Sequence, residues 1–271
     1  MKTFLIPVDF SATSINAAEY AVALTKQIPN AQLILYNVFS SISFAALTEK
    51  EPGSRKMVTD AELSALRNRL DITENQQVTI ESEEGSLIEN IEKYVVSNHI
   101  DMVIMGITGS SRLTQVFMGT NTLNVVRHIK CPVMIIPPEA KFIGIKNVLL
   151  ASDFKDVART VPFASLKKVL DMFHPKLNIL NVDSEHYIEL SDEFKIEREA
   201  MEEKLGAYNP EFSFLRAYDF LDGINEFIES REIDTIITVP KKHSMMSQLF
   251  KTSHTKKLAY HSHVPIIAVP S

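Results

Sequence analysis

A glycine-rich segment before the middle of the chain is the clearest candidate for chemistry. Gly106, Gly109 and Gly119 are three of only 8 glycines, and they fall within 14 residues. Glycine permits positive φ angles and lets a ligand approach bare backbone N–H groups, which is how loops hold phosphate. Gly119 and Thr120 precede a helix predicted over residues 122–129, whose N-terminus adds unpaired N–H donors and partial positive charge. The segment predicts a phosphate-binding loop, and glycines that serve only tight turns are the alternative.

Arg112 lies in the same segment and has two interpretations. Its guanidinium is either a charge-assisted donor to the terminal phosphates of a ligand or a side chain that faces water. The segment lacks the Gly-Lys-Ser/Thr sequence of nucleotide-hydrolysing P-loops, and no general base stands out beside it. Fast hydrolysis of a nucleotide is therefore not expected.

The chain repeats itself. Residues 4–10 match residues 148–154 with a spacing of 144. Residues 100–101 match residues 233–234 with a spacing of 133, so the second copy is 11 residues shorter after its second predicted strand. No further gap is needed to the end of the chain. Such self-similarity indicates a duplicated domain.

Short apolar runs alternate with helix-like stretches in each copy, in the order βαβαβαβαβ. In the first copy these runs are residues 4–8, 33–38, 78–80, 102–105 and 133–136. Apolar strands separated by helices are typical of a parallel sheet that helices cover on both faces. We therefore predict two tandem α/β domains, residues 1–138 and 145–271, each with a doubly wound, parallel, five-stranded sheet.

Two helices of the first copy carry further signals. Ala17, Ala18 and Ala21 form a small-residue face that suits close packing on a sheet. Ser86 and Glu89 have the spacing of a capping box, which predicts a helix that begins there.

The pattern Gly106-x2-Gly109-x9-Gly119-Thr120 resembles the phosphate-loop signature of the universal stress protein family, in its ATP-binding branch. The resemblance covers essentially the whole chain, twice over, and includes Asp9 at the end of the first predicted strand. It implies a stress-response protein of adenine-nucleotide α-hydrolase-like fold, with strand order 3-2-1-4-5 in each domain. It also implies an ATP site where the first and fourth strands part.

The resemblance assigns roles to single residues. In ATP-binding relatives the aspartate that closes the first strand contacts the adenosine part, which here is Asp9. The main chain at the end of the second strand reads the adenine edge, which here is Val38. The implied binding residues are Pro7, Asp9, Val38, Gly106, Gly109, Ser110, Arg112, Gly119, Thr120 and Asn121. The expected ligand is ATP or another adenine nucleotide, and an accompanying Mg²⁺ or Mn²⁺ ion is left open.

The second copy has lost the phosphate-binding pattern. The positions of the three glycines and the threonine hold Val239, Lys242, Thr252 and Ser253. Pro240 also removes a backbone donor from this segment. Asp153 and Val182 persist at the adenosine-facing positions, so a ligand without phosphates is one interpretation. An aspartate that only bonds its own turn is the other.

Composition limits the partners and the compartment. A net charge of −6 and a pI near 5.8 argue against a nucleic-acid-binding surface. One cysteine, Cys131, excludes an intrachain disulfide framework and fits the cytoplasm, and we expect it to be buried and apolar. No run approaches the ~18 apolar residues of a membrane span. His261 and His263 lack cysteine or carboxylate ligands beside them, so no metal site is predicted.

These observations favour a nucleotide-binding regulatory protein with one ATP site in the first domain. A slow ATPase and a scaffold that binds no nucleotide are the alternatives.

The last predicted strands, residues 133–136 and 266–269, are apolar and would invite pairing at a sheet edge. Because family members commonly dimerise through this strand, the resemblance implies an intramolecular pseudo-dimer, and a further homodimer is left open. Residues 40–44, in the longer segment 39–70 of the first copy, are either a flexible cover or an ordinary loop.

Overall fold

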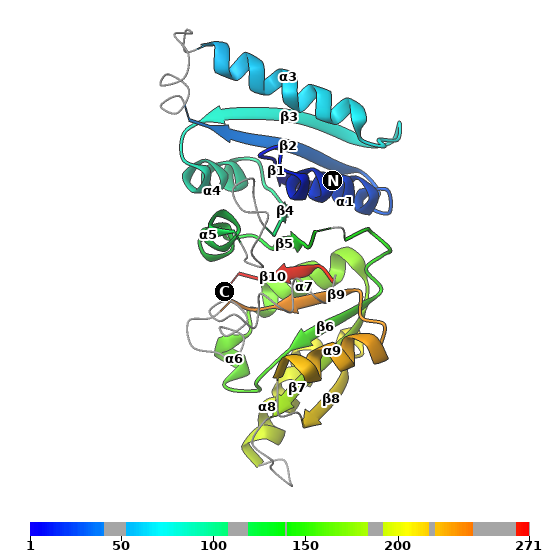
Figure 1. The fold of residues 1–271 in the computed structure, drawn as a ribbon. Helices are drawn as coiled ribbons and strands as arrows, with labels where there is room; N and C mark the ends of the chain where they lie inside the picture. The colour runs from blue at the N-terminus through cyan, green and yellow to red at the C-terminus, as the bar shows by residue number, and fades with distance from the viewer. Residues whose placement is uncertain are drawn as a thin grey trace. The chain divides into compact units, whose positions relative to one another are not determined.

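The computed structural model describes residues 1–40, 53–107, 119–138, 140–183, 192–216, 220–240 and 264–270. The chain divides into two units, Met1–Phe142 and Ile143–Ser271. Each unit alternates strands with helices along the chain, as the colours of Figure 1 show.

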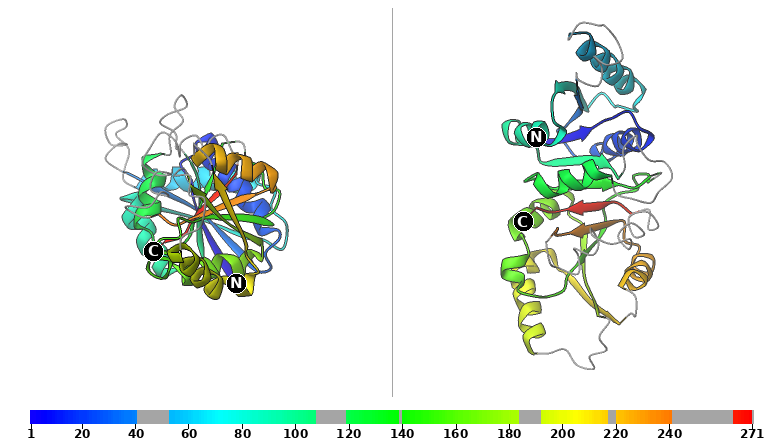
Figure 2. Two further views of the ribbon diagram at one scale, coloured as in Figure 1. Left: turned by 90° about the horizontal axis from the view of Figure 1, so that it is seen from below. Right: turned by 60° about the vertical axis from the view of Figure 1, so that its left-hand side comes forward.

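The first unit is a parallel α/β sheet. Its elements are β1 (Lys2–Pro7), α1 (Ala12–Thr25), β2 (Ala31–Phe39), α3 (Gly53–Arg69), β3 (Gln77–Glu84), α4 (Leu87–Ser97), β4 (Met102–Gly106), α5 (Thr120–His128) and β5 (Val133–Ile136). The strands pair in parallel in the order β3-β2-β1-β4-β5. The predicted fold class and the order 3-2-1-4-5 are confirmed. Helices α1 and α3 pack on one face, and α4 and α5 contact each other on the other (Figure 2).

The second unit repeats this order. Its elements are β6 (Asn147–Ala151), α6 (Val157–Thr160), α7 (Phe163–Phe173), β7 (Lys176–Asp183), α8 (Asp192–Leu205), η1 (Gly206–Tyr208), β8 (Glu211–Arg216), α9 (Phe220–Ser230), β9 (Thr235–Thr238) and β10 (Ile266–Ala268). Its strands follow the order β10-β9-β6-β7-β8, all parallel. The predicted tandem α/β architecture therefore holds, while the pseudo-dimer packing stays a prediction.

The small-residue face of α1 behaves as predicted. Ala17, Ala18 and Ala21 are fully buried, as are Phe4 and Ile6 of β1. Short side chains let the helix backbone approach the sheet, and each large side chain buried beneath it contributes about 1.5–3 kcal/mol. The central strands of the first unit are therefore held firmly under α1.

One aspartate in each unit fastens the amino end of the first strand. Asp101 Oδ2 accepts the Thr3 N–H at 2.8 Å. In the second unit Asp234 Oδ2 accepts the Lys146 and Asn147 N–H groups at 2.7 and 2.9 Å. The repeat therefore extends from the sequence to individual hydrogen bonds.

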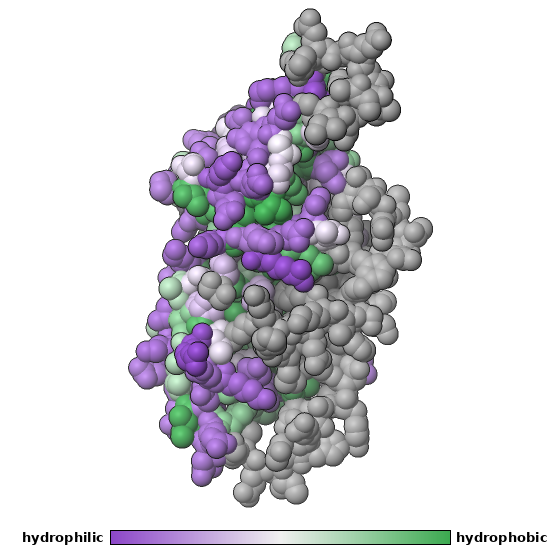
Figure 3. Space-filling model, turned by 90° about the vertical axis from the view of Figure 1, so that its left-hand side faces the viewer, coloured by the Kyte–Doolittle hydropathy of each residue, from purple (hydrophilic) through white to green (hydrophobic). Residues whose placement is uncertain are grey.

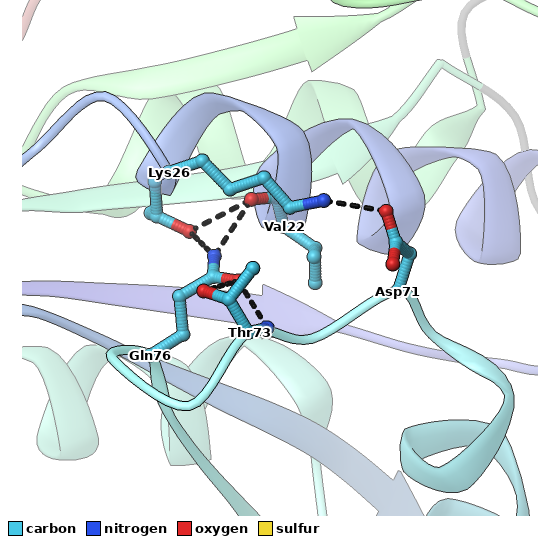
Figure 4. A network of polar contacts seen from close by, with 6 residues as sticks. Val22, Lys26, Asp71, Thr73 and Gln76 are labelled. Atoms are coloured by element: carbon cyan, nitrogen blue, oxygen red, sulfur yellow. Dashed lines mark hydrogen bonds and ion pairs between the residues drawn. The ribbon is translucent and has the colours of Figure 1, made fainter.

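The turn before β3 is fastened to the last turn of α1 (Figure 4). Gln76 Nε2 donates to the Val22 carbonyl at 2.8 Å, and Gln76 Oε1 accepts the Thr73 N–H at 3.0 Å. Lys26 and Asp71 add an ion pair at 2.5 Å. The Asp71 carboxylate is largely exposed, so the ion pair contributes little to stability. The hydrogen bonds of the Gln76 side-chain amide hold the turn.

One local prediction differs from the structure. Ser86 occupies the N-cap of α4 as predicted, but its side chain makes no capping hydrogen bond. The helix that the alternating order predicts between the second and third strands is α3, Gly53–Arg69, which packs on β2 and β3. The proposed cover at residues 40–44 lies outside the described residues, except for Ser40.

The described part of the chain has no helix long and apolar enough to cross a membrane. On the face drawn in Figure 3 the described surface residues are mostly hydrophilic, and apolar residues form small groups between them.

Candidate functional site

The described binding residues of the sequence analysis gather where three neighbouring strands end. β1 pairs with β2 on one side and with β4 on the other. Pro7 closes β1, Val38 is the penultimate residue of β2, and Gly106 closes β4. Thr120 and Asn121 begin α5, which follows β4. Carboxyl ends of parallel strands lie at one edge of a sheet, where ligands of such folds bind.

β2 extends beyond β1 at this edge. The pairing of the two strands ends at Tyr36, whose C=O accepts the Val8 N–H at 2.8 Å. On the opposite side of β2, the Gly85 N–H bonds to the Phe39 C=O at 3.0 Å. Backbone groups alternate sides along a strand, so Val38 directs its N–H and C=O to the same side as Tyr36. Val38 thus presents a donor and an acceptor beyond the end of β1.

Asp9 sits in a tight turn between β1 and α1. The next residue, Phe10, has a positive φ of 62°. Asp9 Oδ1 accepts the Ser11 N–H at 3.1 Å and the Ser11 hydroxyl at 2.5 Å. Ser11 Oγ also accepts the Ser14 N–H at 3.2 Å and so caps α1. The exposed Asp9 carboxylate is therefore held in direction by the turn and the helix that follow it.

Gly106 leaves room for the backbone of α1, which was not predicted from the sequence. A Cβ at this position would lie 2.7 Å from the Thr13 carbonyl oxygen and 2.8 Å from its carbon. Real Cβ atoms do not approach backbone this closely, so Gly106 lets the first turn of α1 pack against the end of β4. Its carbonyl accepts the hydroxyl of the buried Thr122 at 3.0 Å.

The loop after β4 is closed at its base. The Ile107 N–H donates to the Ile136 carbonyl at 3.0 Å, and the Ile107 carbonyl accepts the Gly119 N–H at 2.7 Å. These bonds bring the two ends of the glycine-rich segment together beside β4 and β5. The predicted residues Gly109, Ser110 and Arg112 lie outside the described residues.

Among the residues that the structure describes, no side chain caps the N-terminus of α5. Gly119 is its N-cap residue and makes no side-chain hydrogen bond, and Thr120 and Asn121 are exposed. Arg127 and His128 lie in the last turn, where positive charge complements the helix dipole. An uncapped helix N-terminus at the end of a glycine-rich loop favours binding of an anion such as phosphate.

Three residues that shape this edge were not predicted from the sequence. Asn37 Nδ2 donates to the Val8 carbonyl at 2.7 Å and so joins β2 to the residue after β1. Thr13 supplies the backbone that faces Gly106, and Thr122 binds the Gly106 carbonyl. The repetition of Asn37 as Asn181 was a signal that could have found it. No sequence signal marked the two threonines.

Part of this arrangement recurs in the second unit. The Ser152 N–H donates to the Leu180 carbonyl at 2.9 Å, and Asn181 Nδ2 donates to the Ser152 carbonyl at 3.0 Å. Asp153 Oδ1 accepts the Lys155 N–H at 3.2 Å, which is the turn hydrogen bond that the sequence analysis considered. Phe154 repeats the positive φ of Phe10, at 49°. The strand ends are therefore built in the same way.

The ends of β4 and β9 differ. Val239 replaces Gly106 and is buried. Pro240 replaces Ile107 and has no N–H to donate, so the bond that Ile107 makes to β5 has no counterpart. Lys242, Thr252 and Ser253 lie outside the described residues.

The first helix of the second unit also begins differently. Where α1 runs unbroken, the corresponding stretch is split into α6 and α7 by Pro162. The Glu197 carboxylate on α8 accepts the Val157 N–H at 2.8 Å at the start of α6. Phe154 packs against the Phe194 ring, with centroids 4.8 Å apart. An anion that approached this turn would meet a carboxylate and apolar rings.

Cys131 behaves as a buried apolar residue. Its side chain is 5% exposed, and burial raises the pKa of the thiol to about 12. Such a thiol stays protonated and unreactive at neutral pH. Within the described ranges no three His, Cys, Asp or Glu side chains come together to hold a metal ion. His261 and His263 fall outside those ranges.

The chain is similar to known proteins in sequence and in structure. The model of the Universal stress protein family matches residues 1–137. Universal stress protein MJ0531 of Methanocaldococcus jannaschii is 25% identical over 146 residues, which are 52% of this chain and 84% of that protein.

Solved structures share the architecture of the whole chain. The crystal structure of a universal stress protein from Archaeoglobus fulgidus DSM 4304 is similar with a TM-score of 0.64 at 19% identity, covering 99% of this chain and 96% of that one. A functionally unknown protein from Pseudomonas aeruginosa PAO1 gives a TM-score of 0.59 at 10% identity, covering 100% and 92%. At these identities the likeness supports the fold.

Proposed function

Because this chain belongs to the universal stress protein family, we propose that it is a nucleotide-responsive regulatory protein with one ATP site, in its first unit. The site is the carboxyl edge of β2, β1 and β4 together with the N-terminus of α5. The observation that carries the proposal is the extension of β2 past β1, which presents the Val38 backbone beside the Asp9 turn.

Adenine fits the Val38 backbone by its hydrogen-bonding pattern. Its exocyclic amino group can donate to the Val38 C=O, and its ring N1 can accept from the Val38 N–H. Asp9, whose carboxylate is held by Ser11, would accept hydrogen bonds from ribose hydroxyls. Charge-assisted bonds of this kind are about twice as strong as neutral ones. The adenosine part of the ligand would thus be held by backbone and carboxylate groups.

The phosphates would lie toward α5. Gly119, Thr120 and Asn121 offer backbone N–H groups at an uncapped helix start, where the dipole favours negative charge. Gly109, Ser110 and Arg112 belong to the proposed site on the sequence pattern alone. A Mg²⁺ or Mn²⁺ ion would accompany the phosphates of ATP.

The second unit is proposed to bind no nucleotide phosphate. Val239 and Pro240 replace a glycine and a backbone donor, and Glu197 places a carboxylate at the start of α6. We propose that this unit serves as a structural partner of the first, in a pseudo-dimer within one cytoplasmic chain. Regulation would then follow from occupancy of the single site rather than from turnover.

The test is to identify what the purified protein carries and binds. Full-length protein prepared without added nucleotide is denatured, and the released small molecules are identified by chromatography. Calorimetric titration with ATP follows, on wild type and on Gly109→Val. Released adenine nucleotide, or saturable ATP binding that Gly109→Val abolishes, supports the proposal. An empty protein that takes up no ATP at millimolar concentration rejects it and leaves the scaffold alternative.

A further inference from the structure

A half-buried polar cluster joins β2, β3 and α4 close to the Val38 backbone. Tyr36 is fully buried, and its hydroxyl donates to Glu83 Oε2 at 2.7 Å. Asn90 Nδ2 donates to the same carboxylate oxygen at 3.1 Å. The Tyr94 ring packs against Tyr36, with centroids 4.8 Å apart. Burial and the neighbouring Glu83 carboxylate raise the pKa of Tyr36, so its hydroxyl keeps its proton and acts as the donor.

The cluster lies where β2 has support on one side only. β1 pairs with β2 as far as Tyr36, whereas β3 continues to Phe39. Glu83 is the register partner of Val38, and Tyr36 precedes Val38 by two residues on the same face of the sheet. The position of the Val38 backbone therefore depends on β3, and the Tyr36–Glu83 hydrogen bond ties β3 to β2 at this point.

The turn that follows β3 is part of the same arrangement. Asn90 Nδ2 also donates to the Glu84 carbonyl at 3.2 Å. Gly85 has a φ of +140°, and a Cβ there would lie 2.9 Å from Asn90 Oδ1. Its N–H bonds to the Phe39 carbonyl. Asn90 thus holds both the carboxylate and the turn that extend the β2–β3 ladder past Val38.

The second unit makes the same strand extension without the cluster. Leu180 and Phe227 stand at the positions of Tyr36 and Tyr94, and both are buried. β7 nevertheless continues past β6 in register with β8, where Val182 pairs with Leu215. The fold therefore does not need the hydroxyl or the carboxylate, which points to a role specific to the first unit.

We infer that Tyr36 and Glu83 are positioning residues that hold the Val38 backbone in register to read a base and so set a preference for adenine over guanine. The inference rests on the proposed nucleotide site. Guanine presents a ring N–H and a carbonyl where adenine presents an acceptor and an amino group. A fixed N–H and C=O pair matches adenine and meets guanine donor to donor and acceptor to acceptor. A backbone that can shift discriminates less between the two bases.

The experiment measures the dissociation constants of ATP and GTP by competition on the full-length protein. Tyr36→Phe removes one hydroxyl, and Tyr94→Phe removes one from the adjacent ring as the matched control. Losing one buried hydrogen bond should lower the ratio of ATP to GTP affinity by about fivefold in Tyr36→Phe, while Tyr94→Phe stays within about twofold of wild type. Glu83→Ala should lower the ratio at least as much, because it also removes the hydrogen bond from Asn90. The double variant Tyr36→Phe/Glu83→Ala should lower it no further than Glu83→Ala, because the Tyr36–Glu83 interaction is already broken.

The outcomes separate this inference from the proposed function. Wild type that binds ATP without preferring it to GTP, or a ratio unchanged in Tyr36→Phe and Glu83→Ala, overturns the positioning role and leaves the ATP site standing. An equal fall in Tyr94→Phe attributes the effect to general packing and also overturns it. Wild type that binds neither nucleotide rejects the proposed function and the inference together. Inorganic triphosphate, which has no base, should compete equally in wild type and Tyr36→Phe.

Discussion

The two units share a fold and differ at one edge. At the amino ends of the strands, Asp101 and Asp234 make corresponding hydrogen bonds. At the carboxyl ends, Asn37 and Asn181 again correspond, but the segment after the fourth strand does not. Gly106 faces the backbone of α1, whereas a buried valine takes its place in the second unit. Architecture was thus kept in both copies while one copy lost the groups that suit a phosphate.

The difference also concerns the helix that faces this edge. α1 starts as one continuous helix that packs against Gly106, and its counterpart is broken at Pro162. The Cβ of Val239 and an unbroken helix start would compete for the same place. Loss of the glycine and the break in the helix are therefore consistent with one another, and the substitution Val239→Gly alone would not restore a site.

The largest effect should come from adding one methyl group at Gly106. In Gly106→Ala the new Cβ would lie 2.7 Å from the Thr13 carbonyl oxygen, so α1 must shift. Overpacking of this kind costs about 2 kcal/mol in the free energy of unfolding. Gly206→Ala is the control, since a Cβ there meets nothing within 4 Å. Urea unfolding of both variants should show a loss only in the first, and equal midpoints would contradict the packing role of Gly106.

The second-largest effect should be a difference in ATP affinity between variants of Asp9 and of its counterpart Asp153. Asp9→Asn keeps an oxygen for the Ser11 N–H and removes the negative charge, so ATP should bind at least about tenfold more weakly. Asp153→Asn is the same change at the corresponding turn and should leave the ATP affinity unchanged. Calorimetric titration distinguishes the two variants. Equal losses would mean that the second unit takes part in binding.

A third pair of variants should show no difference between the units. Asn37→Ala and Asn181→Ala each remove one amide hydrogen bond to the residue after the first strand, at 2.7 and 3.0 Å. Each should lower the free energy of unfolding by about 1 kcal/mol. Chemical denaturation checks both. A loss of unfolding free energy in Asn37→Ala but not in Asn181→Ala would show that the second unit does not depend on this hydrogen bond.

The smallest effect is a pH dependence in the second unit. Burial raises the pKa of the Asp234 carboxyl above its ordinary value of 3.8. Because the pKa is raised in the folded state, folding favours the protonated carboxyl. The stability that this protonation adds is fully present below pH 3.8 and is lost as the pH rises through the folded-state pKa. The difference in thermal midpoint between wild type and Asp234→Asn should therefore fall as the pH rises above 3.8. A difference that grows with pH would contradict the burial effect.

Repetition and apolar periodicity made the fold predictable. The duplicated Asp9 and Asp153 segments and the apolar strands gave two parallel sheets, and the small residues of α1 gave its buried face. The alternating order predicted a helix between the second and third strands, but the bounds of α3 were not predicted, because its sequence is polar and has no periodic apolar pattern. The missing cap at Ser86 shows that spacing alone does not fix a side-chain rotamer.

The site was less predictable than the fold. The sequence placed Asp9, Val38 and Gly119 at strand and helix ends, where the structure also has them. It assigned Gly106 to ligand approach, which stays a prediction, and did not reveal that Gly106 packs against the backbone of Thr13, which is distant in sequence. The Tyr36–Glu83 cluster depends on the register of β2 with β3 and on α4, so no local pattern could reveal it.

The stoichiometry of ATP binding tests the contrast between the units most directly. Equilibrium dialysis of full-length, nucleotide-free protein against labelled ATP gives the number of sites per chain. We expect one site per chain in wild type, with binding weakened at least about tenfold in Asp9→Asn and unchanged in Asp153→Asn. Two sites per chain, or a single site that is weakened in Asp153→Asn and unchanged in Asp9→Asn, would contradict the contrast between the units.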